Sequence, residues 1–515
     1  MTAIMQSGER NADIAALNMN AARAASGFAA LGIGPGDVVA IYLRNDFAFF
    51  EVSVAAGLVG AYSTPANWHN SPDEAAYIFN NSGAKAIIIH ADLYHPIAKA
   101  LPKDVPVFIV ETPAEIMTSY GLSKDQCAAP VGVPLWREWL ADFPAKTKGP
   151  DEAPGTMIYT SGTTGHPKGV RRATPDATQA VAWASIIGHV MGFDPKYGNP
   201  TEMVTVVTGP MYHSAPNAYG LFAFRFGASC VLQPRFDPEE LLAMVEKYKV
   251  THLHMVPTMF VRLLKLPDEV KKKYDLSSLR FVVHAAAPCP VHVKQAMIEW
   301  WGPVIYEYYG GTETGAVVFC DSKEWLAHPG TVGKAFAAAE VRVISDDGAE
   351  LAKGAIGEVV CRMQSLPDFT YHGDDEKRRR AEKVGLISLG DVGYLDDDGF
   401  LYLCDRAKDM IISGGVNIYP AEIEAELHKM PGVNDCAVFG IPNEEFGEEV
   451  FAVVQRLPGA SITEAEVRAF LRERIAGYKV PRQVEFHTDL PREDSGKIFK
   501  RKLRAPFWEA AGRSI

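Results

Sequence analysis

Short apolar runs alternate with helical patterns through the first four hundred residues of this chain. Five of these runs have the length of buried strands: residues 38–43, 86–89, 203–207, 252–256 and 281–283. A helix is expected at residues 238–248, with Asp237 as its N-terminal cap. Strands and helices in alternation pack as helices on the faces of parallel sheets. The pattern therefore predicts an α/β fold with ligand crevices at the carboxyl ends of the strands.

The length of 515 residues exceeds that of a usual single domain, so at least two domains are expected. A turn-rich segment at residues 148–155 and a transition at residues 405–409 are candidate connectors. Beyond the second connector, the pattern changes to a mixture of short strands and two helices. The expected elements there are a helix at 420–427 with Pro420 in its first turn, strands at 437–439, 450–454 and 484–486, and a helix at 463–475. These elements predict a compact α+β unit at the C-terminal end.

Residues 159–169 surround one lysine with glycines and hydroxyl side chains, in the order Tyr-Thr-Ser-Gly-Thr-Thr-Gly-His-Pro-Lys-Gly. Glycines let backbone N–H groups turn toward an anion, hydroxyls donate further hydrogen bonds, and Lys168 supplies a mobile positive charge. The pattern G-x-x-x-x-G-K-[ST] is not matched, because Gly169 stands where a hydroxyl would hold magnesium. A flexible surface turn would explain the glycines but not the repeated Ser/Thr-Gly units. We therefore interpret the segment as a phosphate-binding loop.

Five segments in the same order resemble the adenylate-forming enzymes, which include acyl- and aryl-CoA synthetases, luciferases and peptide-synthetase adenylation domains. They are residues 159–169, 308–315, 390–406, 408–420 and 491–498. The resemblance implies a large multi-layer α/β N-terminal domain at residues 1–407 and a small α+β C-terminal domain at residues 408–515, hinged at Lys408. It also implies that the small domain rotates between two poses. One pose presents Lys497 to the site, and the other presents the CoA-side loop at Gly414 and Gly415.

The resemblance implies an ATP site assembled from several of these segments. Thr160 and Glu313 are the implied Mg²⁺ ligands, and Asp391 and Arg406 are the implied ribose contacts. Without the resemblance, Glu313 could be a solvated loop carboxylate, Asp391 could belong to an Asx turn and Arg406 could form a surface ion pair. A reaction that joins a carboxylate to the α-phosphate of ATP needs such a metal and fixed positive charge to offset repulsion between anions. The implied ATP-binding residues are Thr160, Ser161, Gly162, Thr163, Thr164, Gly165, Lys168, Tyr309, Gly310, Gly311, Thr312, Glu313, Asp391, Arg406 and Lys497.

Lys497, Lys168 and His213 are the candidate catalytic residues. The resemblance assigns to Lys497 the task of steadying the carboxylate and the α-phosphate during adenylation. Membership in a solvated basic run is the alternative for Lys497, and it suits the cations that follow at 500–504. The family usually has Thr or Asn where this chain has Asp494. We expect that difference to affect the rate of the reaction rather than the role of Lys497.

The residue at position 213 separates branches of the family. Amino-acid-activating relatives carry Asp there, whereas acyl- and aryl-activating relatives carry an aromatic residue or His that shapes the tunnel toward the thiol. A single His after a strand is otherwise more often structural. The implied acyl pocket combines small alanines with aromatic surface, which favours a fatty, aryl or bulky ring-containing acid over acetate. Its candidate residues are Tyr212, His213, Asn217, Ala285, Ala286, Tyr308, Gly310 and Val317.

Charge and cysteine usage argue against other classes of protein. The chain has 51 basic and 63 acidic residues, a formal net charge of −12, and only local basic clusters at 377–380 and 500–504, which is unlike a nucleic-acid binder. Seven cysteines without a C-x-x-C pair predict reduced thiols rather than disulfides or a zinc site. No secretion signal opens the chain and no apolar run approaches transmembrane length, so we expect a cytoplasmic protein without a membrane span. The sequence leaves the oligomeric state open, a homodimer included.

These observations predict an AMP-forming acyl-CoA synthetase with a small-molecule carboxylic acid, ATP and CoA as substrates and Mg²⁺ as cofactor. The acid would be adenylated with release of pyrophosphate, and CoA would then displace AMP to give a thioester. One alternative is an adenylating enzyme whose acceptor is an amine or a carrier protein. Another is an inactive nucleotide-binding relative. The inactive relative is supported only by Asp494. It is opposed by the presence of all five charged residues that the family uses: Lys168, Glu313, Asp391, Arg406 and Lys497.

Overall fold

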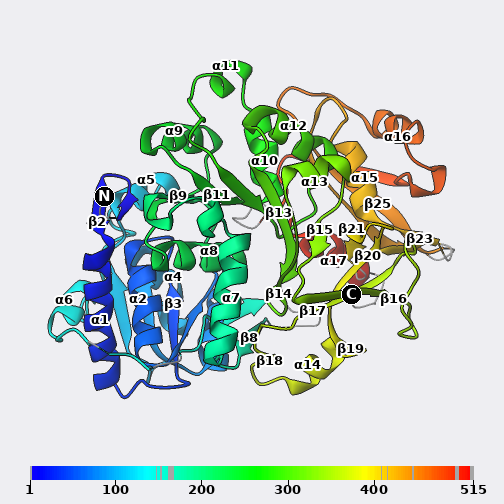
Figure 1. The fold of residues 1–515 in the computed structure, drawn as a ribbon. Coiled ribbons are helices and arrows are strands. Elements are labelled where there is room, and N and C mark those ends of the chain that lie inside the picture. Colours follow the sequence, from blue (N-terminus) through cyan, green and yellow to red (C-terminus); the bar gives the residue numbers. More distant parts are fainter. Residues whose placement is uncertain are drawn as a thin grey trace.

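The computed structural model describes residues 3–146, 148–150, 153–160, 167–406, 409–413, 416–443, 446–492 and 498–510, with the side chains of 405 and 406 excepted. Figure 1 shows a large body that runs from blue to yellow and, on the right, a small body in orange and red. The prediction of an α/β fold with a large N-terminal domain and a smaller C-terminal domain is confirmed.

The largest sheet among the described residues is a long central sheet of 14 strands in the large domain. Its strands from β13 to β1 are parallel, and those from β16 to β13 are antiparallel. In spatial order they are β16 (Ala339–Ile344), β17 (Gly357–Met363), β20 (Leu386–Leu395), β21 (Phe400–Arg406), β15 (Gly333–Ala335), β14 (Gly315–Cys320), β13 (Ile305–Gly311), β12 (Phe281–His284), β11 (His252–Met255), β9 (Val204–Val207), β10 (Ser229–Leu232), β1 (Ile4–Ser7) and β2 (Arg10–Asp13), with β19 (Glu382–Lys383) beside β20.

A second, parallel sheet lies beside the first in the N-terminal part of the chain. Its order is β4 (Tyr62–Pro65), β3 (Val38–Tyr42), β5 (Ala84–His90) and β6 (Val107–Val110). One shared core lies between the two sheets and is filled by α1 (Ile14–Ala30), α2 (Phe47–Leu58), α6 (Trp136–Ala141), α7 (Ala177–Val190) and α8 (Ser214–Arg225). The outer face of the second sheet packs on α3 (Pro72–Ser82) and α4 (Ala91–Ile97). The outer face of the central sheet packs on α9 (Pro238–Tyr248), α10 (Pro257–Leu264), α12 (Val291–Trp301) and α13 (Ser322–Ala327). These layers confirm the multi-layer architecture.

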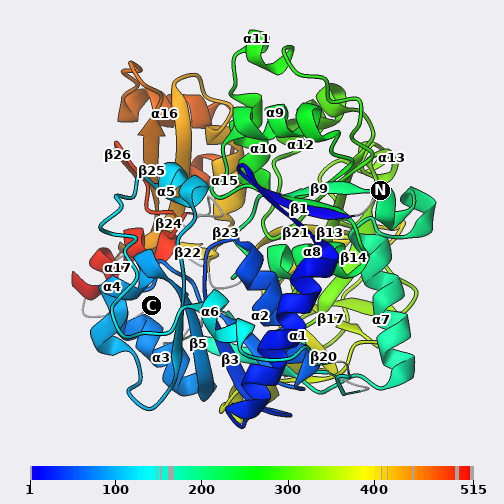
Figure 2. The same cartoon turned by 90° about the vertical axis from the view of Figure 1, so that its left-hand side faces the viewer.

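The small domain is built on a sheet of five described strands. The path is β23 (Val416–Ile418), β22 (Ile411–Ser413), β25 (Gly447–Arg456) and β24 (Val433–Asn443), with β26 (Gln483–His487) beside β25. One face packs against α15 (Pro420–Leu427) and α16 (Glu464–Arg472), and the other packs against α17 (Lys500–Ala510). In both views α15 lies beside α10 and α12 of the large domain (Figures 1 and 2).

The structure confirms the local sequence signals. All five apolar runs are strands, and α9 has the predicted bounds with the Asp237 carboxylate accepting a hydrogen bond from the Glu240 amide at 2.9 Å. Pro420 opens α15 in the first turn, as expected. The described residues among 148–155 form neither helix nor strand. The remaining short elements are α5 (Ala114–Tyr120), α11 (Asp268–Lys271), α14 (Asp375–Ala381), η1 (Ala98–Ala100), η2 (Pro195–Tyr197), η3 (Pro200–Glu202) and η4 (Gly477–Lys479).

Within the described ranges, no helix combines the length and the apolar character that crossing a bilayer would require.

Candidate active site

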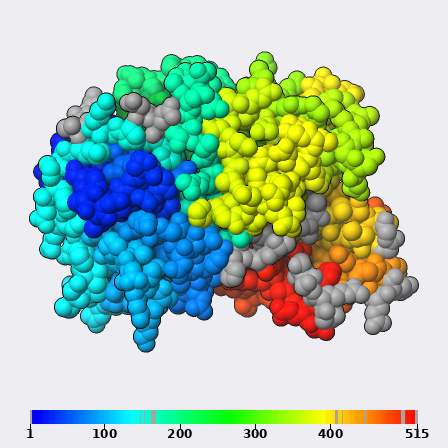
Figure 3. Space-filling model, turned by 90° about the horizontal axis from the view of Figure 1, so that it is seen from below, coloured from blue at the N-terminus to red at the C-terminus, as the bar shows by residue number. Residues whose placement is uncertain are grey.

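A cleft of about 3250 Å³ lies between the two domains and is lined by residues of both. Seen from below, the red C-terminal segment and the yellow segment of the large domain lie on the same face of the molecule (Figure 3). On the large-domain side, the cleft is lined by residues that follow or end the parallel strands β9, β11, β12 and β13. This is the position that the alternation of strands and helices predicted for a ligand crevice.

A small antiparallel sheet builds one end of the cleft. Its order is β18 (Phe369–Tyr371), β8 (Lys168–Arg172) and β7 (Ile158–Thr160). Thr160 and Lys168 are register partners, and the Thr160 hydroxyl lies 3.5 Å from the Lys168 carbonyl oxygen. The Lys168 ammonium lies 3.4 Å from the Asp374 carboxylate. The sheet therefore places two predicted ATP-binding residues side by side, with the charge of Lys168 already paired.

Glu313 is held at this end of the cleft by side chains that the sequence did not single out. The Tyr371 hydroxyl donates a hydrogen bond to the Glu313 carboxylate at 2.9 Å. The Arg172 guanidinium donates to the carbonyl oxygens of Thr312 at 2.6 Å and Glu313 at 2.7 Å, and to that of Pro367 at 2.9 Å. Burial lowers the pKa of Arg172 to about 10. Arg172 thus fixes the backbone that carries Glu313.

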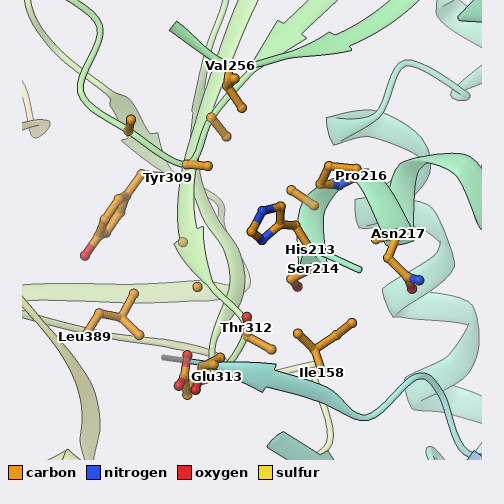
Figure 4. Close-up of a pocket in the computed structure, with 18 of the residues that line it drawn as sticks. Ile158, His213, Ser214, Pro216, Asn217, Val256, Tyr309, Thr312, Glu313 and Leu389 are labelled. Carbon is orange, nitrogen blue, oxygen red and sulfur yellow. The ribbon is translucent and has the colours of Figure 1, made fainter. Parts of the chain in front are cut away.

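Thr160 and Glu313 have the donor chemistry that Mg²⁺ prefers, since both offer hard oxygen atoms. Both residues line the cleft, and Figure 4 shows the Glu313 carboxylate near Thr312 at one end of it. The hydrogen bond that the Glu313 carboxylate accepts from Tyr371 comes from a neutral hydroxyl, so that contact does not neutralise the negative charge of Glu313. These residues fit a magnesium site.

The predicted ribose side of the ATP site also comes together on neighbouring strands. The Tyr309 hydroxyl donates to the Asp391 carboxylate at 2.8 Å, and Asp391 is the register partner of Arg406. The Gly310 backbone passes so close to the next strand that an added Cβ would lie 1.9 Å from the Gly315 carbonyl oxygen. Only glycine fits at position 310, which explains the glycine directly after Tyr309.

His213 lies in the middle of the cleft wall. It directly precedes α8, and its ring centroid is 4.4 Å from that of Tyr212. Figure 4 shows the imidazole between the strand of Tyr309 and the helix of Pro216 and Asn217.

The turn that carries His213 is held by two asparagines. Asn217 donates to the Met211 carbonyl oxygen at 2.9 Å. Asn45, which the sequence did not suggest, donates to the Gly209 carbonyl oxygen and accepts from the Met211 amide, both at 2.9 Å. The orientation of His213 therefore depends on buried amide contacts from α8 and from the loop before α2.

Most candidate acyl-pocket residues line the cleft, among them Ala285, Ala286 and Tyr308, whose hydroxyl lies 3.2 Å from the His254 Nε2 atom. Val317 differs from the expectation. Its side chain is fully buried in a core with Val343, Val359 and Leu401 and does not line the cleft. Side chains alternate between the two faces of a strand, and Ala316 is the residue that faces the cleft.

An apolar branch of the cleft was missed by the sequence reasoning. It runs between α7 and α8, and the Trp183 indole covers Gly315 so closely that an added Cβ there would lie 2.6 Å from the ring. The sequence signal is the recurrence of apolar residues every three or four positions on both helices. The lining residues are Ala180, Trp183, Ala184, Ile187 and Met191 on one side and Ala215, Ala218, Leu221 and Phe222 on the other.

Several predicted residues lie outside the described part of the chain: Ser161, Gly162, Thr163, Thr164, Gly165, Lys408, Gly414, Gly415 and Lys497. The described ends of the segment that contains Lys497 are joined by a bridge between Arg492 and Ile498. Arg492 lies 2.7 Å from Asp435, and Lys500 lies 2.8 Å from Glu424. The segment is therefore anchored to the small domain at both ends.

A separate pocket of about 390 Å³ lies on the small domain. Its wall includes Ser413 and Val416, which flank positions 414 and 415, together with the aromatic rings of Phe446 and Tyr478. Arg468, Arg472 and Arg482 also line it. The Arg482 guanidinium lies 4.2 Å from the Phe446 ring centroid. An anionic ligand with a flat ring would suit this combination of charges and aromatic surface.

All seven cysteines are free thiols, as expected. One of them, Cys436, lies with His428 and Asp435 in a group whose potential ligand atoms are within 4.8 Å of one another. The Asp435 carboxylate already pairs with Arg492, and burial raises the pKa of the Cys436 thiol well above its usual range. Both features oppose a cation there, so we assign no metal to this group.

Comparisons with known proteins place the chain in a family. The model of the AMP-binding enzyme family matches residues 2–366, and that of the AMP-binding enzyme C-terminal domain matches residues 422–497. The feruloyl-CoA synthase of an Amycolatopsis species is 33% identical over 497 residues, covering 96% of this chain and 93% of that protein. The long-chain-fatty-acid–CoA ligase FadD13 of Mycobacterium tuberculosis is 32% identical over 498 residues, covering 96% and 92%.

A solved structure extends the likeness to the whole fold. The amide bond synthetase McbA of Marinactinospora thermotolerans superposes with a TM-score of 0.81 at 25% identity, covering 98% of this chain and 97% of that one. The chain belongs to the AMP-binding enzyme family, which confirms its resemblance to the adenylate-forming enzymes.

Proposed function

We propose that this protein is an acid–CoA ligase that adenylates a hydrophobic carboxylic acid and transfers the acyl group to CoA. The observation that carries the proposal is the apolar branch between α7 and α8, which opens from the cleft that Glu313 and Asp391 also line. An acid bound in that branch would direct its carboxylate toward the nucleotide end. The named relatives act on feruloyl and long-chain fatty acyl groups, which are both large and apolar.

In the first step, an oxygen of the acid forms a bond to the α-phosphorus of ATP while the bond to pyrophosphate breaks. Asp391 and Arg406 hold the ribose, Lys168 and the 161–165 loop hold the phosphates, and Lys497 steadies the carboxylate and the α-phosphate. Magnesium, the usual cofactor of AMP-forming CoA ligases, would be held by Thr160 and Glu313 and would offset phosphate charge. These residues act through position and electrostatics, so no covalent protein intermediate is needed.

In the second step, the CoA sulfur attacks the acyl carbon, and AMP leaves. The pocket beside Ser413 and Val416 supports this step, because its three arginines and two rings suit the phosphates and the base of a nucleotide. We place the hinge at Lys408, between domains at 1–407 and 408–515, so that rotation exchanges Lys497 for the Gly414–Gly415 loop. His213 would line the path of the thiol.

The test is to incubate the purified protein with ATP, Mg²⁺ and CoA against ferulate, decanoate, a bulky alicyclic acid and acetate. We expect AMP and a thioester from some of the large acids and little from acetate. Ala218→Trp, which fills the apolar branch, should remove activity on the large acids, whereas the exposed Val181→Trp on α7 should not. Equal turnover of acetate and decanoate would refute the hydrophobic acid.

A second candidate is an amide synthetase, and the likeness to McbA supports it. The two candidates share the first step and differ in the acceptor. Pyrophosphate release without a thioester, followed by amide formation when an amine is supplied, would favour the amide synthetase. If no acid and no acceptor gave AMP, pyrophosphate or an acyl product, an inactive nucleotide-binding relative would instead be favoured.

A further inference from the structure

A lysine without a carboxylate partner lines the phosphate end of the cleft. Lys377 lies on α14, three residues after Asp374, and its side chain is half-buried in the cleft wall. Within the described ranges, no carboxylate oxygen lies within 4.0 Å of its ammonium group, which instead lies 4.0 Å from the centroid of the Tyr371 ring. Unlike Lys168, whose ammonium lies 3.4 Å from Asp374, Lys377 forms no ion pair with a residue in the described part of the chain.

The position of Lys377 relates it directly to the candidate magnesium ligand. The ring that Lys377 covers belongs to Tyr371, and the hydroxyl of that same ring donates to Glu313 at 2.9 Å. Burial lowers the pKa of Lys377, and attraction to Glu313 and Asp374 opposes this shift. Lys377 is thus a half-buried ammonium near Glu313 and Lys168 that makes no ion pair with any residue the structure describes, and such a group is suited to bind an anionic ligand.

We propose that Lys377 is a second phosphate-binding cation of this cleft, which contacts the β- and γ-phosphates of ATP and the pyrophosphate that leaves. The inference rests on the proposed adenylation reaction. As the acid oxygen bonds to the α-phosphorus, the electron pair of the breaking bond moves to pyrophosphate, which gains negative charge. A cation at the far end of the triphosphate stabilises that charge more than it stabilises bound ATP.

Neighbouring cations on α14 are less suited to this role. Arg378 is engaged by Asp368 and Glu382, both at 2.8 Å. Arg380 lines the cleft but is 68% exposed and lies 3.9 Å from Glu376. Arg379 is exposed and does not line the cleft, so it provides a control on the same helix with the same change of charge.

The experiment measures binding of pyrophosphate to the full chain in the presence of Mg²⁺ by calorimetry, without acid or CoA. Lys377→Gln should raise the Kd for pyrophosphate by about tenfold or more, the effect of losing one charge-assisted hydrogen bond. Arg379→Gln should leave the Kd unchanged, and Lys377→Arg should retain most of the affinity. Wild-type affinity in Lys377→Gln would overturn the inference.

The half-reactions separate this role from a structural one. In acid-dependent exchange of pyrophosphate into ATP, Lys377→Gln should raise the KM for pyrophosphate, while thioester formation from a supplied acyl-adenylate stays at the wild-type rate. Equal loss of both half-reactions with a lower Tm would show a structural role and overturn the inference. If the wild-type protein exchanges no pyrophosphate with any acid, the proposed function fails, and the calorimetric comparison still decides the role of Lys377.

Discussion

The two walls of the cleft are held by different kinds of contact. On the large-domain wall, Arg172 binds the carbonyl oxygens of Thr312 and Glu313, and Tyr309 binds the buried Asp391. The Arg172 bonds join the β18-β8-β7 sheet to the turn between β13 and β14, and the Tyr309 bond joins β13 to β20 within the central sheet. On the small-domain wall, the segment around Lys497 is anchored by ion pairs of partly exposed side chains, Arg492 with Asp435 and Lys500 with Glu424.

The contact across the domains resembles the second kind. Lys265 of the large domain donates to the carbonyl oxygen of Asn434 and, at 2.9 Å, to its side-chain oxygen, both at an exposed position. Partly exposed pairs cost little to break, whereas buried bonds to backbone carbonyls cost much more. The difference indicates that the large-domain wall, where we propose the metal and ribose sites, is preorganised, whereas the contacts of the small-domain wall cost less to break, as the proposed rotation requires. Four substitutions test this contrast, in order of decreasing effect.

The largest effect is expected from Lys497→Ala, which removes the positive charge that we propose acts on the α-phosphate. Adenylate formation, measured by pyrophosphate exchange, should fall by at least about 100-fold, because a cation at the developing charge is lost. Thioester formation from a supplied acyl-adenylate should remain, since it uses the other pose. If both half-reactions fall equally, rotation between two poses is the wrong account for this chain.

Arg172→Lys tests the rigid wall. A lysine cannot reach three carbonyl oxygens at once, so unfolding in urea should show a loss of about 2 kcal/mol or more. Displacement of Glu313 should also slow adenylation by about tenfold or more and raise the Mg²⁺ concentration required. The neighbour Arg171 contacts the Tyr62 ring instead, so Arg171→Lys is the matched control and should be mild. Equal losses of stability and of adenylation in the two variants would contradict the role of Arg172 in holding the backbone that carries Glu313.

Asp435→Asn tests the movable wall. It weakens the pair with Arg492, and because both side chains are partly exposed, the loss of stability should stay below about 1 kcal/mol. Adenylation should slow by about two- to fivefold, since the segment that carries Lys497 loses one anchor, and the thioester step should be unchanged. The exposed Glu485, replaced by Gln, serves as the control. A large decrease of Tm in Asp435→Asn would show that the contact between Asp435 and Arg492 is as costly to break as the buried contacts of the large-domain wall.

The smallest effect is expected from Asp494→Thr, which introduces a residue usual in the family. Activity should stay within about twofold of wild type or rise, because Thr is a residue that the family usually carries at this position. Steady-state turnover with the best acid of the panel is the measurement. A severe loss would give Asp494 a role of its own.

Local patterns predicted what depends on local forces. The apolar runs became strands because they could be buried on both faces, and Asp237 capped α9 because its carboxylate reaches an amide three residues away. The site was predictable where residue types were unusual for their setting, as with Glu313 after two glycines. Arg172 and Lys377 were not predictable in this way, because each looks like an ordinary surface cation in the sequence. Their roles depend on partners more than a hundred residues away for Arg172, and on a cleft wall for Lys377.

The sequence by itself determined the α/β layers, the two-domain order and the family, because periodicity, caps and motif order are properties of neighbouring residues. Only the tertiary structure decided which face each strand residue takes, so that Ala316 rather than Val317 meets the cleft. It also decided that α7 and α8 enclose an apolar branch, and that Asp374 pairs with Lys168 while Lys377 makes no ion pair with the residues described. These outcomes depend on distances between segments far apart in the chain, which packing sets and local sequence does not encode.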